Sequence, residues 1–154
     1  MFVLFGPPAS GKTTLGRALA KALDQPLIDT DELIEAHTGK SRHLLIQDEP
    51  VFRALETQII LTLKPAIIAL GGGAILNPTN LAHLQTLGQL VYIDCPTHLL
   101  KTRYGKRRTP LSLIETRRPL YENIPALRID ATLPLEAKLQ ILQTQKSPIS
   151  QSMR

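Results

Sequence analysis

The segment at residues 6–13 contains the first residues that could take part in a reaction. It reads GPPASGKT and fits the pattern G-x-x-x-x-G-K-[ST]. Glycine lets consecutive backbone N–H groups face one anion, and a helix that begins at such a loop adds the positive end of its dipole. Lys12 can reach the β- and γ-phosphates of a nucleotide, and the Thr13 hydroxyl can ligate magnesium. The segment therefore predicts a site for ATP with Mg2+. The residues expected to bind the nucleotide are Ala9, Ser10, Gly11, Lys12, Thr13 and Thr14.

The elements around this loop are those that a phosphate-binding loop needs, an apolar strand over residues 2–5 and an amphipathic helix over residues 13–23. Short apolar runs then alternate with helical patterns along the chain. Further strands are expected at residues 27–28, 66–70, 90–93 and 127–129, and helices at 31–37, 50–63, 78–87, 98–104, 118–123 and 135–143. This alternation predicts an α/β fold with three αβα layers, a parallel sheet covered by helices on both faces.

Four polar or glycine-rich features directly follow strands: the 6–13 loop, Asp29, the glycines 71–73 and Asp94. Ligands of parallel sheets bind at the carboxyl ends of the strands, so we expect these features to share one edge of the sheet. Residues 91–94 read VYID, an apolar strand that ends in an aspartate, as in the magnesium-binding strand of other P-loop proteins. Asp94 is therefore one candidate for the magnesium site.

The composition fits a single domain: 154 residues, 43% hydrophobic and 20% charged. We place the domain at residues 1–146, followed by a disordered tail at 147–154. No apolar run approaches the roughly 18–20 residues of a membrane span, so no membrane partner is expected. The single cysteine, Cys95, cannot form an internal disulfide, which favours the cytoplasm, and we expect it to be a small buried hydrophobic residue.

The net charge is +5, and basic residues gather within a stretch of sixteen residues. They are Arg103, Lys106, Arg107, Arg108, Arg117 and Arg118. Aromatic residues make up only 4% of the chain, so few side chains could stack on bases, and no nucleic-acid partner is expected. The cluster instead predicts a local anion site. Residues 105–116 are basic and lack periodicity, and we expect them to form a mobile lid.

Read in order, the motifs resemble the shikimate kinase family from about residue 3 to about residue 142. The resemblance rests on GPPASGKTTLGRALA, Asp29-Thr30-Asp31, Thr38-Gly39, Phe52-Arg53 with Glu56, Gly71-Gly72-Gly73 and Arg117-Arg118-Pro119-Leu120-Tyr121. It implies the fold of nucleoside monophosphate kinases, with strand order 2-3-1-4-5. It also implies transfer of the γ-phosphoryl group of ATP to the 3-hydroxyl of shikimate, in the biosynthesis of aromatic amino acids.

The resemblance also implies roles for individual residues, and their chemistry agrees. Arg53 and Arg117 offer planar guanidinium groups suited to the carboxylate of shikimate, and Glu56, one helical turn away, can orient Arg53. Asp31 can accept hydrogen bonds from hydroxyl groups and take the proton of the attacking one. The expected substrate-binding residues are Asp31, Arg53, Gly71, Gly72, Gly73 and Arg117. The expected catalytic residues are Lys12, Asp31 and Arg108.

The metal site is expected at Thr13 and Asp29, with Asp29 holding a magnesium-bound water, and Asp94 is the alternative to Asp29. Asp31 is in addition a candidate N-cap for the helix that follows it.

The lid departs from the family pattern Arg-Pro-Leu, because residues 109–111 read TPL. The pattern would place its arginine at position 109, and Arg108 lies one residue before that position. Arg108 is our first choice for contacting the transferring phosphate, with Arg107 second. Arg103 is a candidate for stacking near adenine. The segment 41–48 is shorter than the acceptor-binding region of the family. Its apolar residues, expected to pack, are Leu44, Leu45 and Ile46.

Other functions stay open at this point. The acceptor could be gluconate or a nucleoside monophosphate, because paired arginines suit a phosphate as well as a carboxylate. Because the lid arginine is displaced by one residue from the family pattern, the chain could also be a non-catalytic ATP-binding module. A GTPase is disfavoured, since the sequence has no N-K-x-D motif to read a guanine base. We expect a monomer with ATP and shikimate as its small-molecule partners.

Overall fold

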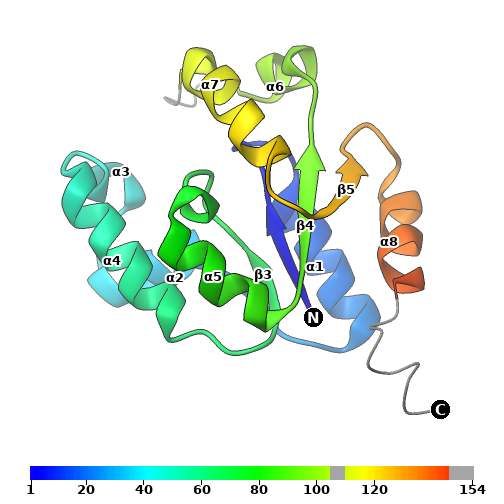
Figure 1. Cartoon of the computed structure of the whole chain (residues 1–154), viewed down its shortest axis with the longest axis horizontal. Coiled ribbons are helices and arrows are strands. Elements are labelled where there is room, and N and C mark those ends of the chain that lie inside the picture. The colour runs from blue at the N-terminus through cyan, green and yellow to red at the C-terminus, as the bar shows by residue number, and fades with distance from the viewer. Residues whose placement is uncertain (105–109, 146–154) are drawn as a thin grey trace.

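The structure is a computed structural model of the chain and describes residues 1–104 and 110–145. Its centre is a sheet of five strands in the order β2-β3-β1-β4-β5, and every neighbouring pair is parallel (Figure 1). The strands are β1 (Phe2–Phe5), β2 (Leu27–Asp29), β3 (Ile67–Ala69), β4 (Gln89–Asp94) and β5 (Leu127–Asp130). This confirms the predicted fold class and strand order.

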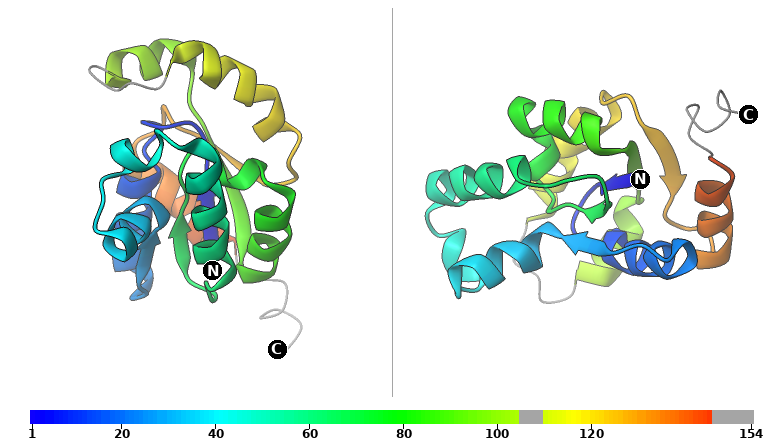
Figure 2. Two further views of the ribbon diagram at one scale, coloured as in Figure 1. Left: turned by 90° about the vertical axis from the view of Figure 1, so that its left-hand side faces the viewer. Right: turned by 90° about the horizontal axis from the view of Figure 1, so that it is seen from below.

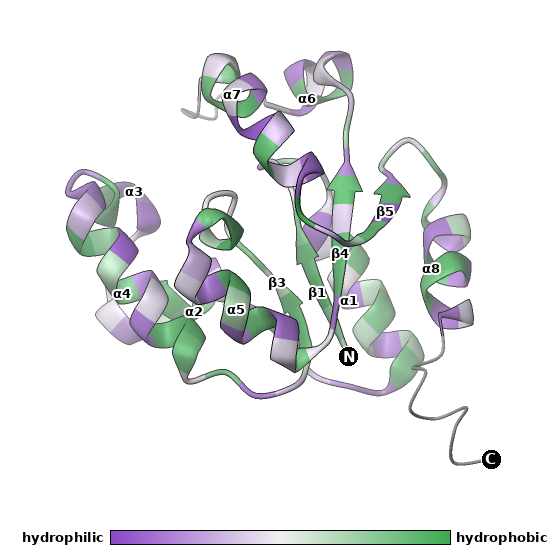
Figure 3. Ribbon diagram, viewed as in Figure 1, coloured by the Kyte–Doolittle hydropathy of each residue, from purple (hydrophilic) through white to green (hydrophobic). Residues whose placement is uncertain are grey.

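The middle strands are apolar on both faces because both faces are covered. Successive residues of β1 alternate between two separate cores, Phe2 and Leu4 in one and Val3 and Phe5 in the other. Strands buried on both sides read as continuous apolar runs, which is why the opening residues lack a polar alternation. The hydropathy colouring shows the same band of hydrophobic residues along the central strands (Figure 3).

Helices form the outer two layers (Figure 2). They are α1 (Lys12–Leu23), α2 (Thr30–Thr38), α3 (Arg42–Leu45), α4 (Glu49–Leu61), α5 (Pro78–Leu87), α6 (Thr97–Tyr104), α7 (Leu111–Glu122) and α8 (Leu135–Thr144), with a 3₁₀ turn η1 (Ala74–Leu76). Leu19 of α1 and Leu142 of α8 belong to one core, and Ile60 of α4 and Leu84 of α5 belong to the other. Cys95 is completely buried, as expected.

Residues 111–116 differ from the sequence expectation, because they form the first half of helix α7. Only Ile114 of this half is buried, so the sequence lacks the repeated apolar spacing that would have indicated a helix. Residues 105–109 of the predicted lid lie outside the described residues, as does the predicted tail at 147–154. The division of the chain into domain and tail remains a prediction.

The segment before α4 corrects two further expectations. Leu44 and Ile46 were expected to pack, but they are 56% and 40% exposed, and only Leu45 packs against the small core around Phe52. The four-residue helix α3 explains this, because it turns one side outward to solvent. Within the described residues, no helix combines the length and apolar character needed to cross a membrane.

Candidate active site

The loop between β1 and α1 has a backbone that only a few residues can adopt. Gly11, which precedes the first turn of α1, has φ of +99°, a conformation open to glycine and strained for other residues. Ala9 has φ of +65°, an uncommon left-handed conformation for a residue with a side chain. Such strain gathers at ligand-binding sites, where the surrounding structure enforces it.

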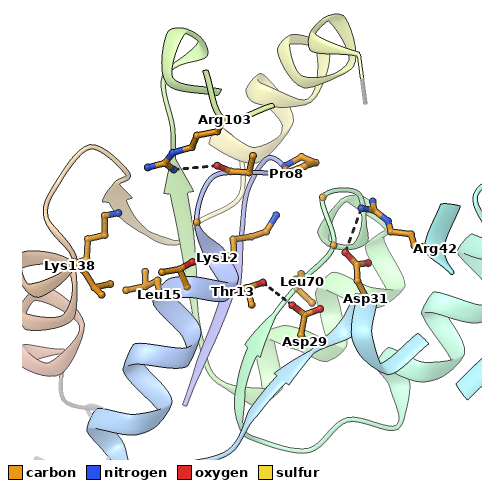
Figure 4. Close-up of a pocket in the computed structure, with 16 residues that line it drawn as sticks. Pro8, Lys12, Thr13, Leu15, Asp29, Asp31, Arg42, Leu70, Arg103 and Lys138 are labelled. Carbon is orange, nitrogen blue, oxygen red and sulfur yellow. Dashed lines mark hydrogen bonds and ion pairs between the residues drawn. The ribbon is translucent and has the colours of Figure 1, made fainter. Parts of the chain in front are cut away.

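Lys12 and Thr13 follow this turn at the start of α1. The buried Lys12 ammonium donates hydrogen bonds to the carbonyl oxygens of Gly6 at 2.5 Å and Pro7 at 3.2 Å, so it lies across the mouth of the loop. The Thr13 hydroxyl donates a hydrogen bond to Asp29 Oδ2 at 2.8 Å (Figure 4). The loop and the end of β2 are thereby joined at the edge of the sheet that the sequence predicted.

A pocket of about 390 Å³ runs along this edge. Its residues include Ala9, Gly11, Lys12, Thr13 and Thr14 of the predicted nucleotide site, together with Asp29, Asp31, Gly71 and Gly72. Ser10 is buried inside the loop, and its hydroxyl finds no hydrogen-bond partner among the described residues. The pocket therefore contains most of the residues that the sequence assigned to the nucleotide, together with the aspartates and two glycines assigned to the metal and the acceptor.

Asp31 lies in the pocket at the start of α2, two residues beyond Asp29. Asp29, and not Asp31, caps this helix, because its Oδ1 accepts a hydrogen bond from the Glu32 N–H at 3.1 Å. Burial raises the pKa of Asp31, although the charges of Arg42 and Lys12 act in the opposite direction. Its Oδ1 atom is buried and accepts no hydrogen bond from any described residue. Asp31 thus presents one acceptor oxygen that a bound hydroxyl group could use.

Arg42 is a member of the site that the sequence did not identify. Its guanidinium lies 3.6 Å from Asp31 Oδ2 and lines the pocket (Figure 4). It comes from α3, where a lone arginine in a short segment carries no motif. Tyr121, the last residue of the motif at residues 117–121, donates a hydrogen bond from its hydroxyl to the Gly72 carbonyl. These two contacts depend on tertiary structure that no sequence spacing reveals.

The glycines after β3 are enclosed by charged side chains from three other elements. A Cβ on Gly71 would lie 2.7 Å from Asp31 Oδ1, and one on Gly73 would lie 2.6 Å from Arg53 Nη2. A Cβ on Gly72 would lie 3.2 Å from Arg117 Nη1. Both predicted substrate arginines therefore lie against this turn, Arg53 from α4 and Arg117 from α7, and the absence of side chains on the turn allows their approach.

Arg53 is oriented by a buried carboxylate, as the i, i+3 spacing predicted. Its Nη1 donates to Glu56 Oε1 at 2.9 Å, and its guanidinium carbon lies 5.1 Å from the centre of the Phe52 ring. Glu56 is only 1% exposed, and burial raises its pKa while the charge of Arg53 lowers it. The ion pair thus fixes a guanidinium beside Gly73 with its charge partly balanced.

Asp94 forms ion pairs outside the pocket. Its carboxylate accepts hydrogen bonds from Arg128 at 2.6 and 2.9 Å and from Arg118 at 3.4 Å, and it is not among the residues that line the pocket. The geometry therefore favours Asp29 over Asp94 as a magnesium partner. No group of three or more His, Cys, Asp or Glu side chains suited to a metal occurs in residues 1–104 and 110–145.

The basic residues after β4 are only partly described. Arg103 of α6 lies over the loop, where its Nη1 donates to the Ala9 carbonyl at 3.2 Å. Arg107 and Arg108, the two candidates for contacting the transferring phosphate, lie outside the described residues.

Comparison with known proteins shows which family this chain is similar to. The sequence model of the shikimate kinase family matches residues 8–153. A shikimate kinase of Corynebacterium efficiens is 38% identical over 143 residues, covering 82% of this chain and 84% of the relative. One of Thermobifida fusca is 40% identical over 136 residues, covering 85% and 74%. A solved shikimate kinase of Acinetobacter baumannii, in complex with shikimate, superposes with a TM-score of 0.80 at 28% identity, covering 93% and 90%.

The buried ion pair leads to a prediction about stability. Arg53→Met leaves Glu56 charged and unpaired, so we expect the free energy of unfolding at pH 7 to fall by about 2 kcal/mol. The loss should shrink as the pH falls, because protonation of Glu56, whose pKa burial raises, removes the unpaired charge. Urea denaturation at several pH values measures both effects.

Two variants make this test specific. Arg17→Met removes an exposed arginine whose pair with Glu32, at 3.4 Å, lies at the surface, and should change stability by less than about 0.5 kcal/mol. Arg53→Met combined with Glu56→Leu replaces the pair by apolar groups and should recover most of the loss. A double variant no more stable than Arg53→Met would show that the unpaired charge is not the cause.

Proposed function

The chain belongs to the shikimate kinase family, and from that premise we propose how its residues carry out the reaction. The enzyme transfers the γ-phosphoryl group of ATP to the 3-hydroxyl of shikimate, giving shikimate 3-phosphate and ADP. The oxygen of the 3-hydroxyl forms a bond to the γ-phosphorus, and the bond from that phosphorus to the ADP oxygen breaks. The residues of the site must therefore hold two anionic reactants in line and accept the proton of the 3-hydroxyl.

The observation that supports this division of roles most strongly is the surroundings of the glycine turn 71–73. Asp31, Arg53 and Arg117 reach this turn from three different helices, directly beside the pocket that contains the phosphate loop. Shikimate carries one carboxylate and three hydroxyl groups. Two guanidinium groups beside one free carboxylate oxygen form a set of partners that suits such a molecule.

We assign the carboxylate of shikimate to Arg53 and Arg117. A guanidinium group can donate two parallel hydrogen bonds to a carboxylate, and such charge-assisted pairs are among the strongest in proteins. Arg53 is held by Glu56 and Phe52, so little of its conformational freedom remains to be lost on binding. Gly71, Gly72 and Gly73 bring the backbone against the substrate because they carry no side chain.

We assign the proton of the 3-hydroxyl to Asp31. Its free Oδ1 can accept a hydrogen bond from the hydroxyl, and its pKa, raised by burial, makes it a better base than an exposed aspartate. Lys12 and the backbone N–H groups at the start of α1 face the phosphates, where they stabilise negative charge as the γ-phosphoryl group moves. Arg108 remains a predicted contributor from the lid.

Magnesium is assigned to Thr13 and Asp29. The residues fit this ion, because a hydroxyl and a carboxylate oxygen lie 2.8 Å apart at the phosphate loop, and magnesium prefers oxygen ligands while keeping several waters. When bound, the ion supplies charge neutralisation to the β- and γ-phosphates. The cap that Asp29 forms on α2 fixes its carboxylate for this role.

The other functions considered from the sequence give way to the family assignment. Gluconate, a nucleoside monophosphate and a non-catalytic ATP-binding module are no longer favoured. A cytoplasmic location and a monomeric state remain predictions.

An acceptor screen tests the proposed function. With ATP and magnesium, a coupled assay of ADP release should respond to shikimate and not to gluconate, AMP or CMP. An ester of shikimate, which lacks the carboxylate charge, should show a KM raised by about tenfold or more, because the arginines lose a charged acceptor. A strong response to a nucleotide with none to shikimate would exclude this function.

A magnesium titration tests the metal assignment. Asp29→Asn should raise the magnesium concentration needed for half-maximal activity by roughly tenfold or more, since the oxygen that orients a metal-bound water loses its charge. Asp94→Asn is the matched control, because it removes the same charge from a carboxylate tied to Arg118 and Arg128. A larger rise for Asp94→Asn than for Asp29→Asn would reverse the assignment.

A further inference from the structure

The two arginines assigned to the carboxylate of shikimate are held in different ways. Arg53 donates to Glu56 at 2.9 Å, whereas Arg117 forms neither a hydrogen bond nor an ion pair with any residue that the structure describes. Its guanidinium nevertheless lies against the glycine turn, where a Cβ on Gly72 would lie 3.2 Å from Nη1. The direction of Arg117 therefore depends on how the backbone of α7 is held.

Helix α7 has a weak point close to Arg117. Pro119 lies inside the helix and has no N–H, so the hydrogen bond that this position would donate to the carbonyl of Glu115 is missing. Helices bend most easily at such a residue. Beyond it, the Tyr121 hydroxyl holds the end of α7 by its hydrogen bond to the Gly72 carbonyl. The turn that carries Arg117 lies on the other side of the proline and needs contacts of its own.

Arg118 makes contacts of this kind with three different acceptors. Its side chain is only 20% exposed, and its guanidinium donates to the carboxylate of Asp94 at 3.4 Å, at the end of β4. It also donates hydrogen bonds to the Cys95 carbonyl at 3.1 Å and to the Thr97 hydroxyl at 3.2 Å. The rigid set of N–H groups on a guanidinium suits several acceptors at once. One side chain thus fastens α7 to the end of β4 and the start of α6 (Figure 1).

The main anchor for Arg118 is itself fixed. Arg128 of β5 donates hydrogen bonds to Asp94 Oδ2 at 2.6 and 2.9 Å, so this carboxylate is held from a second strand. Consecutive residues of a helix point about 100° apart, so Arg118 can face β4 while Arg117 faces the glycine turn. Arg118 is therefore occupied by the protein and can act on a substrate only through the position of its neighbour.

We propose that Arg118 is a positioning residue for the reaction, which holds the backbone of α7 so that Arg117 faces the carboxylate of shikimate. Arg118 does for Arg117 what Glu56 does for Arg53, but through the backbone instead of a direct ion pair. The inference rests on the proposed function, since it takes Arg117 as a partner of that carboxylate. Its consequence is an effect confined to substrates that carry the carboxylate charge.

Steady-state kinetics with shikimate and with its methyl ester, at saturating ATP and magnesium, test the proposal. Arg118→Met removes the guanidinium and keeps an unbranched side chain that suits a helix. We expect the KM for shikimate to rise about tenfold, because a misplaced guanidinium loses much of a charge-assisted pair. The kcat and the KM for the ester should change by less than about twofold. In an Arg117→Met background, Arg118→Met should have no further effect on the KM for shikimate.

Two further variants make the test specific. Arg128→Met removes the other arginine bound to Asp94, but it lies on β5 and should leave both KM values unchanged. Arg118→Lys keeps a positive charge beside Asp94 without the rigid set of donors, so it should raise the KM for shikimate less than Arg118→Met does. Arg118→Lys also replaces Arg118→Met in the comparison of the two substrates if Arg118→Met does not fold.

Three outcomes would overturn the proposal. The first is an unchanged KM for shikimate in Arg118→Met. The second is an equal rise for shikimate and its ester, which would mean that Arg118 supports the whole site. The third is a rise that adds in full to that of Arg117→Met. All three are measured on an enzyme that phosphorylates shikimate, so they are distinct from a failure of the proposed function, in which the unaltered enzyme gives no response to shikimate.

Discussion

The structure depends on one curl of backbone between β1 and α1. Two conditions let its N–H groups converge on a phosphate. β1 must end at the edge of the sheet, and Gly11 must take a left-handed conformation before the helix begins. The buried apolar residues of β1 hold the strand in position, since they pack into the cores on both faces of the sheet. The positive φ of Ala9 shows that the fold sustains strain to keep this shape. The pocket extends from this curl to both sides.

On the acceptor side, the fold keeps charged groups in partly buried positions and balances each against another. Glu56 is buried because Arg53 accompanies it, and Arg42 offsets part of the cost of burying Asp31. The turn at residues 71–73 is the meeting point, because residues without side chains let both arginines and Asp31 approach one stretch of backbone. Pairs of this kind add little net stability, but they hold the guanidinium and carboxylate groups in fixed directions before a substrate arrives.

Local patterns predicted most of this architecture, and the exceptions have physical reasons. The G-x-x-x-x-G-K-[ST] loop and the alternation of apolar runs with helical spacing are encoded within a few residues, so the parallel sheet, Lys12, Thr13 and Asp29 could be placed in advance. The strand order followed only from the resemblance to the family. Arg42 and Tyr121 enter the site through packing between elements distant in sequence, which no local spacing records. The first half of α7 buries a single residue, Ile114, and so left no amphipathic pattern to find. Asp31 was a candidate cap, but Asp29 lies one residue ahead of α2 and takes that position.

The central claim is that Asp31 and the phosphate loop act on one reaction from separate sides of the pocket. Turnover and nucleotide affinity of Asp31→Asn, measured on the same protein, test it most directly, with Asp24→Asn as a control at an exposed left-handed position that asparagine tolerates. The account predicts that Asp31→Asn lowers kcat with saturating shikimate by about a hundredfold or more, while the Kd for magnesium-bound ADP stays unchanged. A kcat close to that of the unaltered enzyme would contradict it.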